Sequence, residues 1–146
     1  MPALEPLVAR IQARLEQYIT PRKLGYVWSR IEVVLDRREG VVLQPDITFV
    51  IEGRESIVTD RVWGPPDMVL EVASALAHTG KPEGRVALCS AYGVREYWLV
   101  QPDLREVVLL ELAHGGVRRR TLLDDRTPIN TPLFFDFDTP LAELLG

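Results

Sequence analysis

Residues 64–74 read Gly-Pro-Pro-Asp-Met-Val-Leu-Glu-Val-Ala-Ser and place two acidic residues in a short apolar segment. The segment is rich in β-branched residues and follows a Gly-Pro-Pro turn, which predicts a strand rather than a helix. Side chains of a strand alternate between its two faces, so Asp67 and Glu71 share one face with Val69, while the residues between them form an ordinary core surface. A carboxylate with apolar neighbours has to be paired, protonated or bound to a cation. Which of these applies is the functional question.

The chain before this strand predicts a helix and an antiparallel hairpin. Apolar residues between Leu4 and Tyr18 recur at intervals of three and four, which is typical of an amphipathic helix, and Thr20-Pro21 ends it. Strand segments are expected at residues 25–29 and 31–35. A polar turn then leads into a long returning strand at residues 41–51, which forms the hairpin.

Proline and glycine divide the rest of the chain into short elements. Pro45 cannot donate a ladder hydrogen bond, so we expect it at a strand start or a bulge. A short strand is expected at residues 56–58. The elements expected after the acidic strand are a helix with apolar positions from Val86 to Tyr92, strands at 96–100, 106–112 and 117–121, and a terminal helix with a capped start at Thr139-Pro140. This order predicts an α/β or α+β domain, with a mixed β-sheet and flanking helices, over residues 1–146.

Composition excludes several classes of protein. The 146 residues suit one domain, and 47% hydrophobic residues are enough for a real core. The sequence holds no apolar run of the roughly 18 residues that span a bilayer, and its start lacks the features of a signal peptide, so we expect a cytoplasmic protein with no membrane partner. The net charge of −4 argues against coating nucleic acid by bulk electrostatics, although it leaves room for a local basic face.

The remaining candidates for chemistry are acidic residues beside or within apolar strands, namely Asp46, Asp67 and Glu71. The sequence has no Gly-rich phosphate loop, nucleophile elbow or zinc-ligand pattern. Carboxylates that converge from neighbouring strands form a site for Mg²⁺ or Mn²⁺, which prefer oxygen ligands and can hold a substrate phosphate. The alternative for Asp46 and Asp67 is that each is a turn residue after proline.

Three ordered segments carry a family resemblance: residues 44–50 (QPDITFV), residues 64–74, and residues 92–100 (YGVREYWLV). They resemble the motifs of the Uma-two family, a bacterial family of restriction-endonuclease-like proteins in the PD-(D/E)xK nuclease superfamily. The resemblance covers nearly the whole chain in order. It implies a restriction-endonuclease-like fold and a metal-dependent endonuclease that hydrolyses DNA, with Mg²⁺ or Mn²⁺ as cofactor.

The resemblance also assigns roles to residues. Pro45-Asp46 and Glu71 look like the two metal ligands of the motif, and Asp67 is expected to assist them. The position of the motif's lysine is Ala73, and in this family a lysine on the next helix takes its role, which here falls on Arg85. The catalytic set is thus Asp46, Glu71 and Arg85.

Arginine cannot act as a general base, because it does not deprotonate, but its planar fork could hold a phosphate or a water. Lys81, in the loop before the helix, is a second candidate for phosphate binding. The missing lysine also supports an alternative, a catalytically impaired nuclease-fold protein that acts as a binding or regulatory module, as a dimer. A third reading is a self-associating structural domain whose interface is formed by Tyr97, Trp98 and the C-terminal phenylalanines. The partners expected from these readings are DNA and a second copy of the chain.

Overall fold

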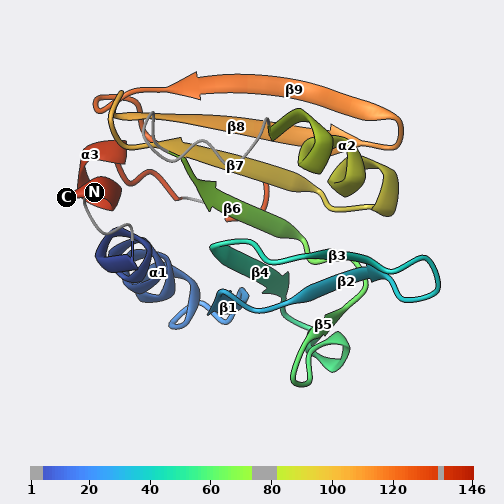
Figure 1. The fold of residues 1–146 in the computed structure, drawn as a ribbon. Helices are drawn as coiled ribbons and strands as arrows, with labels where there is room; N and C mark the ends of the chain where they lie inside the picture. Colours follow the sequence, from blue (N-terminus) through green and yellow to red (C-terminus); the bar gives the residue numbers. More distant parts are fainter. Residues whose placement is uncertain (1–4, 74–81, 135–136) are drawn as a thin grey trace.

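The structure, a computed structural model, describes residues 5–73, 82–134 and 137–146 (Figure 1). Its helices and strands in chain order are α1 (Glu5–Ile19), β1 (Gly25–Ser29), β2 (Val33–Asp36), β3 (Val41–Leu43), β4 (Ile47–Ile51), the 3₁₀ helix η1 (Glu55–Ile57), β5 (Val62–Trp63), β6 (Met68–Val72), α2 (Pro82–Tyr92), β7 (Glu96–Gln101), β8 (Glu106–Ala113), β9 (Gly116–Leu123) and α3 (Leu141–Leu145).

The described residues form a six-stranded sheet in the order β1-β4-β6-β7-β8-β9 and a three-stranded sheet in the order β3-β2-β5. In the large sheet β6 and β7 run parallel, and α2 connects them, while the other neighbours are antiparallel. A parallel pair needs a crossover connection, and here the helix provides it. The predicted mixed α+β fold with flanking helices is therefore confirmed.

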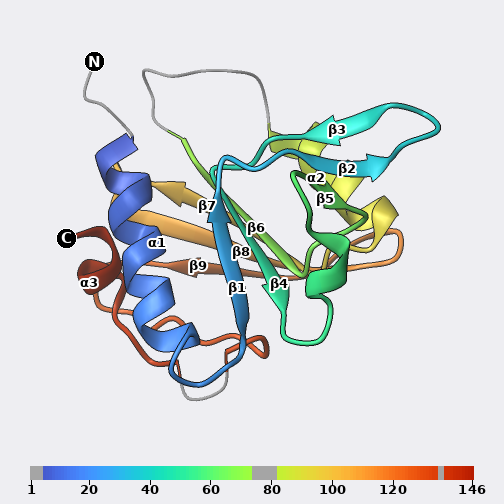
Figure 2. The same ribbon diagram turned by 90° about the horizontal axis from the view of Figure 1, so that it is seen from below.

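The acidic strand lies at the centre of the large sheet, between β4 and β7. Its alternation is as predicted. Met68 and Leu70 pack into a core with α1, α3 and the C-terminal segment, whereas Val69 packs into a second core with α2 and the small sheet. Figure 2 shows this layering, with α1 and α3 on one side of the large sheet and α2 with β2, β3 and β5 on the other. The face of β6 that carries Glu71 is therefore the one covered by α2.

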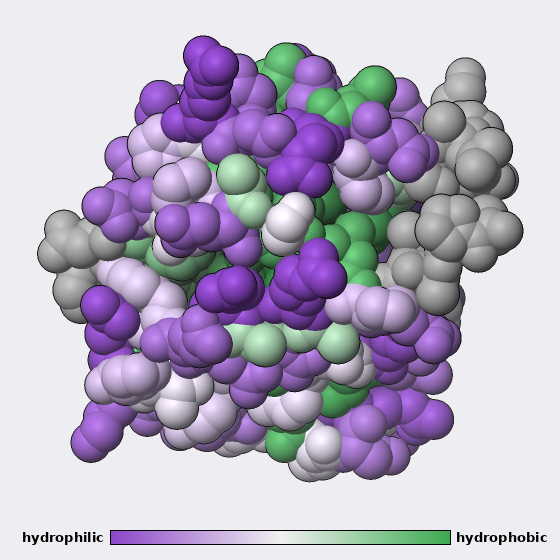
Figure 3. Space-filling view, turned by 90° about the vertical axis from the view of Figure 1, so that its left-hand side faces the viewer, coloured by the Kyte–Doolittle hydropathy of each residue, from purple (hydrophilic) through white to green (hydrophobic). Residues whose placement is uncertain are grey.

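The helix α1 forms because its apolar residues make one continuous stripe. Val8, Ile11, Leu15 and Ile19 are all buried against the sheet, and the polar residues between them are largely exposed. Figure 3 shows the side of the molecule that lies on the left in Figure 1, where hydrophilic side chains surround a smaller hydrophobic area near the middle. None of the helices in the described part of the chain is long and apolar enough to cross a membrane.

Three sequence predictions needed correction. The expected long strand at 41–51 is two strands in different sheets, because Pro45 interrupts the ladder: β3 pairs with β2, and β4 pairs with β1. The expected strand at 56–58 was wrong, since this stretch forms η1 and the short strand of the loop is β5. The terminal helix begins after Pro140 and has no side-chain cap, so the predicted capped start was also wrong.

Candidate functional site

Asp46 lies just before β4 and next to the last residues of β6. Ile47 is paired with Leu70 in the antiparallel ladder, so Asp46 comes beside Glu71. The Oδ2 atom of Asp46 accepts a hydrogen bond of 2.7 Å from the backbone N–H of Val72. This bond joins the start of one strand to the end of the next and fixes the carboxylate at that edge of the sheet.

Burial of Asp46 raises the pKa of its carboxyl group above the ordinary value. The Val72 N–H opposes this shift, the negative charge of Glu71 adds to it, and the positive charges of Arg30 and Arg85 oppose it. A raised pKa in an acid beside another acid is the electrostatic situation that a bound cation would relieve.

Glu71 points from β6 toward α2 and is held at one of its two oxygens. The Nε atom of Arg85 donates a hydrogen bond of 2.6 Å to Oε1, and the hydroxyl of Tyr97 donates to the same oxygen. The side chain of Glu71 is 18% exposed and that of Arg85 is 31% exposed. The ion pair therefore lies at the edge of the core, where solvent and a ligand can reach it.

Arg85 comes from the first turns of α2, the crossover helix that follows β6. Burial alone would lower its pKa, but the hydrogen bonds to Glu71 and Tyr97 and the charge of Glu71 raise the pKa above its usual value. Arg85 therefore stays a cation, as expected for arginine. The hydrogen bond to Glu71 is made by Nε, and a guanidinium also carries donors on its two terminal nitrogens, which is the donor set that a phosphate can accept from.

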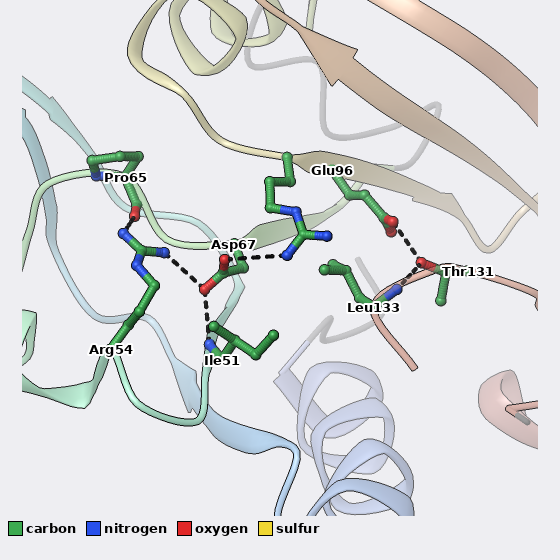
Figure 4. Close-up of polar contacts among 8 residues, drawn as sticks. Ile51, Arg54, Pro65, Asp67, Glu96, Thr131 and Leu133 are labelled. Carbon is green, nitrogen blue, oxygen red and sulfur yellow. Dashed lines mark hydrogen bonds and ion pairs between the residues drawn. The ribbon is translucent and has the colours of Figure 1, made fainter. Parts of the chain in front are cut away.

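Asp67 does not join this group. It precedes the other end of β6, about 13 Å from Glu71 at the usual rise of a strand. Its Oδ2 accepts hydrogen bonds of 2.8 Å from the backbone N–H of Ile51 and from Arg54, and its Oδ1 pairs with Arg95 at 3.7 Å. Figure 4 shows Arg54 reaching both Asp67 and the carbonyl oxygen of Pro65. The carboxylate of Asp67 thus connects the end of β4 and the segments that carry Arg54 and Arg95.

The structure brings Asp46, Glu71 and Arg85 to one end of the sheet, and their catalytic role stays a prediction. Lys81, the second phosphate-binding candidate, lies outside the described residues. Ala73, at the motif's lysine position, continues the backbone pairing of β6 through a hydrogen bond of 2.8 Å from its N–H to the carbonyl of Val100. The only positive charge in hydrogen-bond contact with Glu71, within the part of the chain that the structure describes, is therefore Arg85.

The two carboxylates fit a hard divalent cation such as Mg²⁺ or Mn²⁺. Each has one oxygen bound to the protein, and no donor from the described residues contacts the other oxygen, Asp46 Oδ1 or Glu71 Oε2. Magnesium usually takes one or two carboxylates and completes its octahedron with water and substrate phosphate. Residues 5–73, 82–134 and 137–146 contain no group of three or more His, Cys, Asp or Glu side chains that could hold a metal ion, so a cation at this site would have no third acidic, His or Cys side chain from these residues.

Sequence reasoning missed two members of the site, the backbone N–H of Val72 and the hydroxyl of Tyr97. Tyr97 was considered only as an interface residue, but it is 1% exposed, and Trp98, Phe134 and Phe137 are also buried. These aromatic side chains form the core, so a self-associating interface built from them was wrong, and Phe135 lies outside the described residues. The parallel pairing of Val69 with Tyr97 places Tyr97 on the face of Glu71. The βαβ order of the sequence was the signal that could have revealed this neighbour.

Comparison with known proteins identifies the family and a shared fold. The profile of the Uma2 family, described as "Putative restriction endonuclease", matches residues 1–142. A crystal structure of a nuclease from Anabaena variabilis, described as "putative" and as belonging to DUF820, has a TM-score of 0.76 with this chain at 16% sequence identity. The match covers 99% of this chain and 82% of that one, and it shows a shared fold. No curated protein matches the chain.

Proposed function

Because the chain belongs to the Uma2 family of restriction-endonuclease-like proteins, we propose that it is a metal-dependent endonuclease that hydrolyses phosphodiester bonds of DNA. The observation that carries the proposal is the meeting of Asp46, Glu71 and Arg85 at one end of the central strands. Two acids and one permanent cation can together hold a metal ion and a phosphate. Asp46 directly precedes β4, Glu71 lies on β6 and Arg85 on α2, so the fold itself assembles them.

In this proposal Asp46 and Glu71 hold one Mg²⁺ or Mn²⁺ ion. When bound, the ion polarises the phosphate and lowers the pKa of an attacking water. The protein's own contribution is to keep both carboxylates in place. The Val72 N–H fixes Asp46, and Arg85 with Tyr97 fixes Glu71.

Arg85 would bind the scissile phosphate through its terminal nitrogens and offset the negative charge that develops on its oxygens. It would not remove a proton from water, because its pKa is raised above an already high value. The in-strand lysine of the superfamily motif is replaced by Ala73, so proton removal falls to solvent or to a phosphate oxygen in this proposal.

The absence of the lysine at Ala73 favours one alternative, a nuclease-fold protein that binds DNA or a regulatory partner as a dimer without cleaving it. Both functions use the same cation and phosphate contacts. They differ in turnover, since the alternative predicts metal and DNA binding with no product.

Plasmid nicking separates the two functions. Purified protein is incubated with supercoiled plasmid and Mg²⁺ or Mn²⁺, and the expected result is open-circular and linear DNA that EDTA prevents. Asp46→Asn removes the charge of a ligand and should reduce the rate at least a hundredfold, and Asp60→Asn is the matched control, since the Asp60 side chain is 75% exposed in a distant loop. Equal cleavage by wild type and Asp46→Asn would refute the proposed site.

A further inference from the structure

Tyr97 is a buried polar group whose hydroxyl is directed at the proposed metal site. It lies on β7, next to β6, and its side chain is on the same sheet face as that of Glu71. Its ring packs in the core beside α2, and the residue as a whole is 1% exposed. A buried tyrosine usually finds a partner for its hydroxyl, and the partner here is Glu71 Oε1.

The hydroxyl of Tyr97 acts as a donor. Burial and the neighbouring negative charge of Glu71 raise the pKa of Tyr97 above the usual value, with Arg85 opposing the shift. A carboxylate oxygen can only accept, so the single O–H of Tyr97 points at Glu71.

Two donors thus converge on one oxygen of Glu71, because Arg85 Nε also donates to Oε1. No donor among the described residues is hydrogen-bonded to Oε2. Because both donors bind the same oxygen, they fix the rotation of the carboxylate and make its two oxygens unequal. Oε1 is the structural oxygen and Oε2 is the oxygen left for a cation.

The carboxylate of Asp46 also has one oxygen bound to the protein. Its Oδ2 is bound to the Val72 N–H, and Oδ1 has no donor from the described residues. Both carboxylates are therefore anchored at one oxygen and open at the other, which favours one-oxygen coordination of a cation by each acid. Val72, which anchors Asp46, directly follows Glu71 on β6, so the anchor of one acid is the chain neighbour of the other.

We propose that Tyr97 is a positioning residue that orients Glu71, so that Glu71 Oε2 and Asp46 Oδ1 bind the divalent cation. The inference rests on the proposed function for the presence of a cation, and it adds which oxygens bind and which neighbouring side chain decides this. Side chains that orient a metal ligand typically contribute about tenfold to a hundredfold to metal affinity.

Tyr97→Phe tests the inference, because it removes one oxygen and keeps the ring in the core. Titration calorimetry with Mn²⁺ should give a dissociation constant at least about tenfold higher than that of the wild type. Tyr92→Phe is the matched control: its hydroxyl also donates to a carboxylate, Asp36 Oδ2 at 3.1 Å, but at the small sheet. The Tyr92→Phe protein should bind Mn²⁺ within twofold of the wild type.

Two further readouts separate positioning from general stability. The melting temperatures of the two metal-free variants should fall by similar small amounts, whereas the rise in melting temperature on adding Mn²⁺ should shrink only in Tyr97→Phe. The EPR spectrum of bound Mn²⁺, which reports ligand geometry, should change only in Tyr97→Phe. Unchanged affinity and spectrum in Tyr97→Phe, with Mn²⁺ bound by the wild type, would overturn the inference alone. A wild-type protein that binds no Mn²⁺ would overturn the proposed function and the inference with it.

Discussion

Asp67→Asn is expected to destabilise the protein without weakening its metal site. The substitution keeps the shape of the side chain but removes its charge and one of its acceptor oxygens. Asp67 is almost fully buried, at 4% side-chain exposure, and it accepts from the Ile51 N–H and from Arg54 and pairs with Arg95. Asparagine can place its single carbonyl oxygen at the Oδ2 position and keep both short hydrogen bonds, but the Arg54 bond then loses the help of a negative charge and an amide group replaces the oxygen that faces Arg95.

The size of the loss follows from these contacts. A hydrogen bond to a charged group contributes about 1.5–3 kcal/mol. Arg54 and Arg95 are 39% and 51% exposed, so water partly replaces their partner and the loss stays below that of a fully buried pair. We expect about 2 kcal/mol lower stability, which for a chain of this length lowers the melting temperature by about 4–8 °C.

Urea denaturation and calorimetry measure the two effects on the same samples. The Asp67→Asn protein should unfold at a lower urea concentration and still bind Mn²⁺ with wild-type affinity, and Asp60→Asn should change neither quantity. Wild-type stability together with lost Mn²⁺ binding would refute this reasoning, because it would make Asp67 a metal ligand rather than a structural ion-pair partner.

Three further predictions concern the site and the core. Arg85→Lys should keep the rate of plasmid nicking within about tenfold of wild type, because the positive charge remains. Arg85→Gln should lower that rate about a hundredfold or more. Equal rates for the two variants would argue against phosphate binding by Arg85. Burial raises the pKa of Asp46, so its folded state holds a proton more tightly than the unfolded state, and metal-free stability should fall as pH rises from about 4 through that raised pKa. Asp46→Asn should flatten this fall in thermal melts at pH 4–7, and an unchanged slope would mean that Asp46 is not the group responsible. Phe134→Ala should cost about 3–5 kcal/mol in urea denaturation, because the ring is fully buried and packs edge-on against Phe49, Trp98 and Phe137; a loss below 1 kcal/mol would contradict that packing.

Local patterns were enough to predict the elements that define the fold. The three- and four-residue spacing of α1 and the alternation in β6 are both visible in the structure, because each element has one buried face and a regular period. The acid pair Asp46 and Glu71 could also be predicted, since each stands at the edge of an apolar strand and the strands are neighbours.

Contacts between distant segments could not be predicted in this way. Asp67 was placed with the metal ligands because it shares a strand face with Glu71, but its partners Arg54 and Arg95 come from other loops that only the folded chain brings near. Tyr97 joined the site for a similar reason, since its position depends on the register of β7 against β6. Pro45 was visible as an interruption, although the sequence did not reveal that the chain passes there from the small sheet to the large one.

The central claim is that Asp46 and Glu71 hold a divalent metal ion beside Arg85. A crystal soaked in Mn²⁺ and measured at a wavelength where manganese scatters anomalously tests it most directly. The account predicts one anomalous peak about 2.1 Å from Asp46 Oδ1 and from Glu71 Oε2, with Arg85 and Tyr97 still on Glu71 Oε1. No peak between the two carboxylates, at a Mn²⁺ concentration that supports nicking in solution, would contradict it.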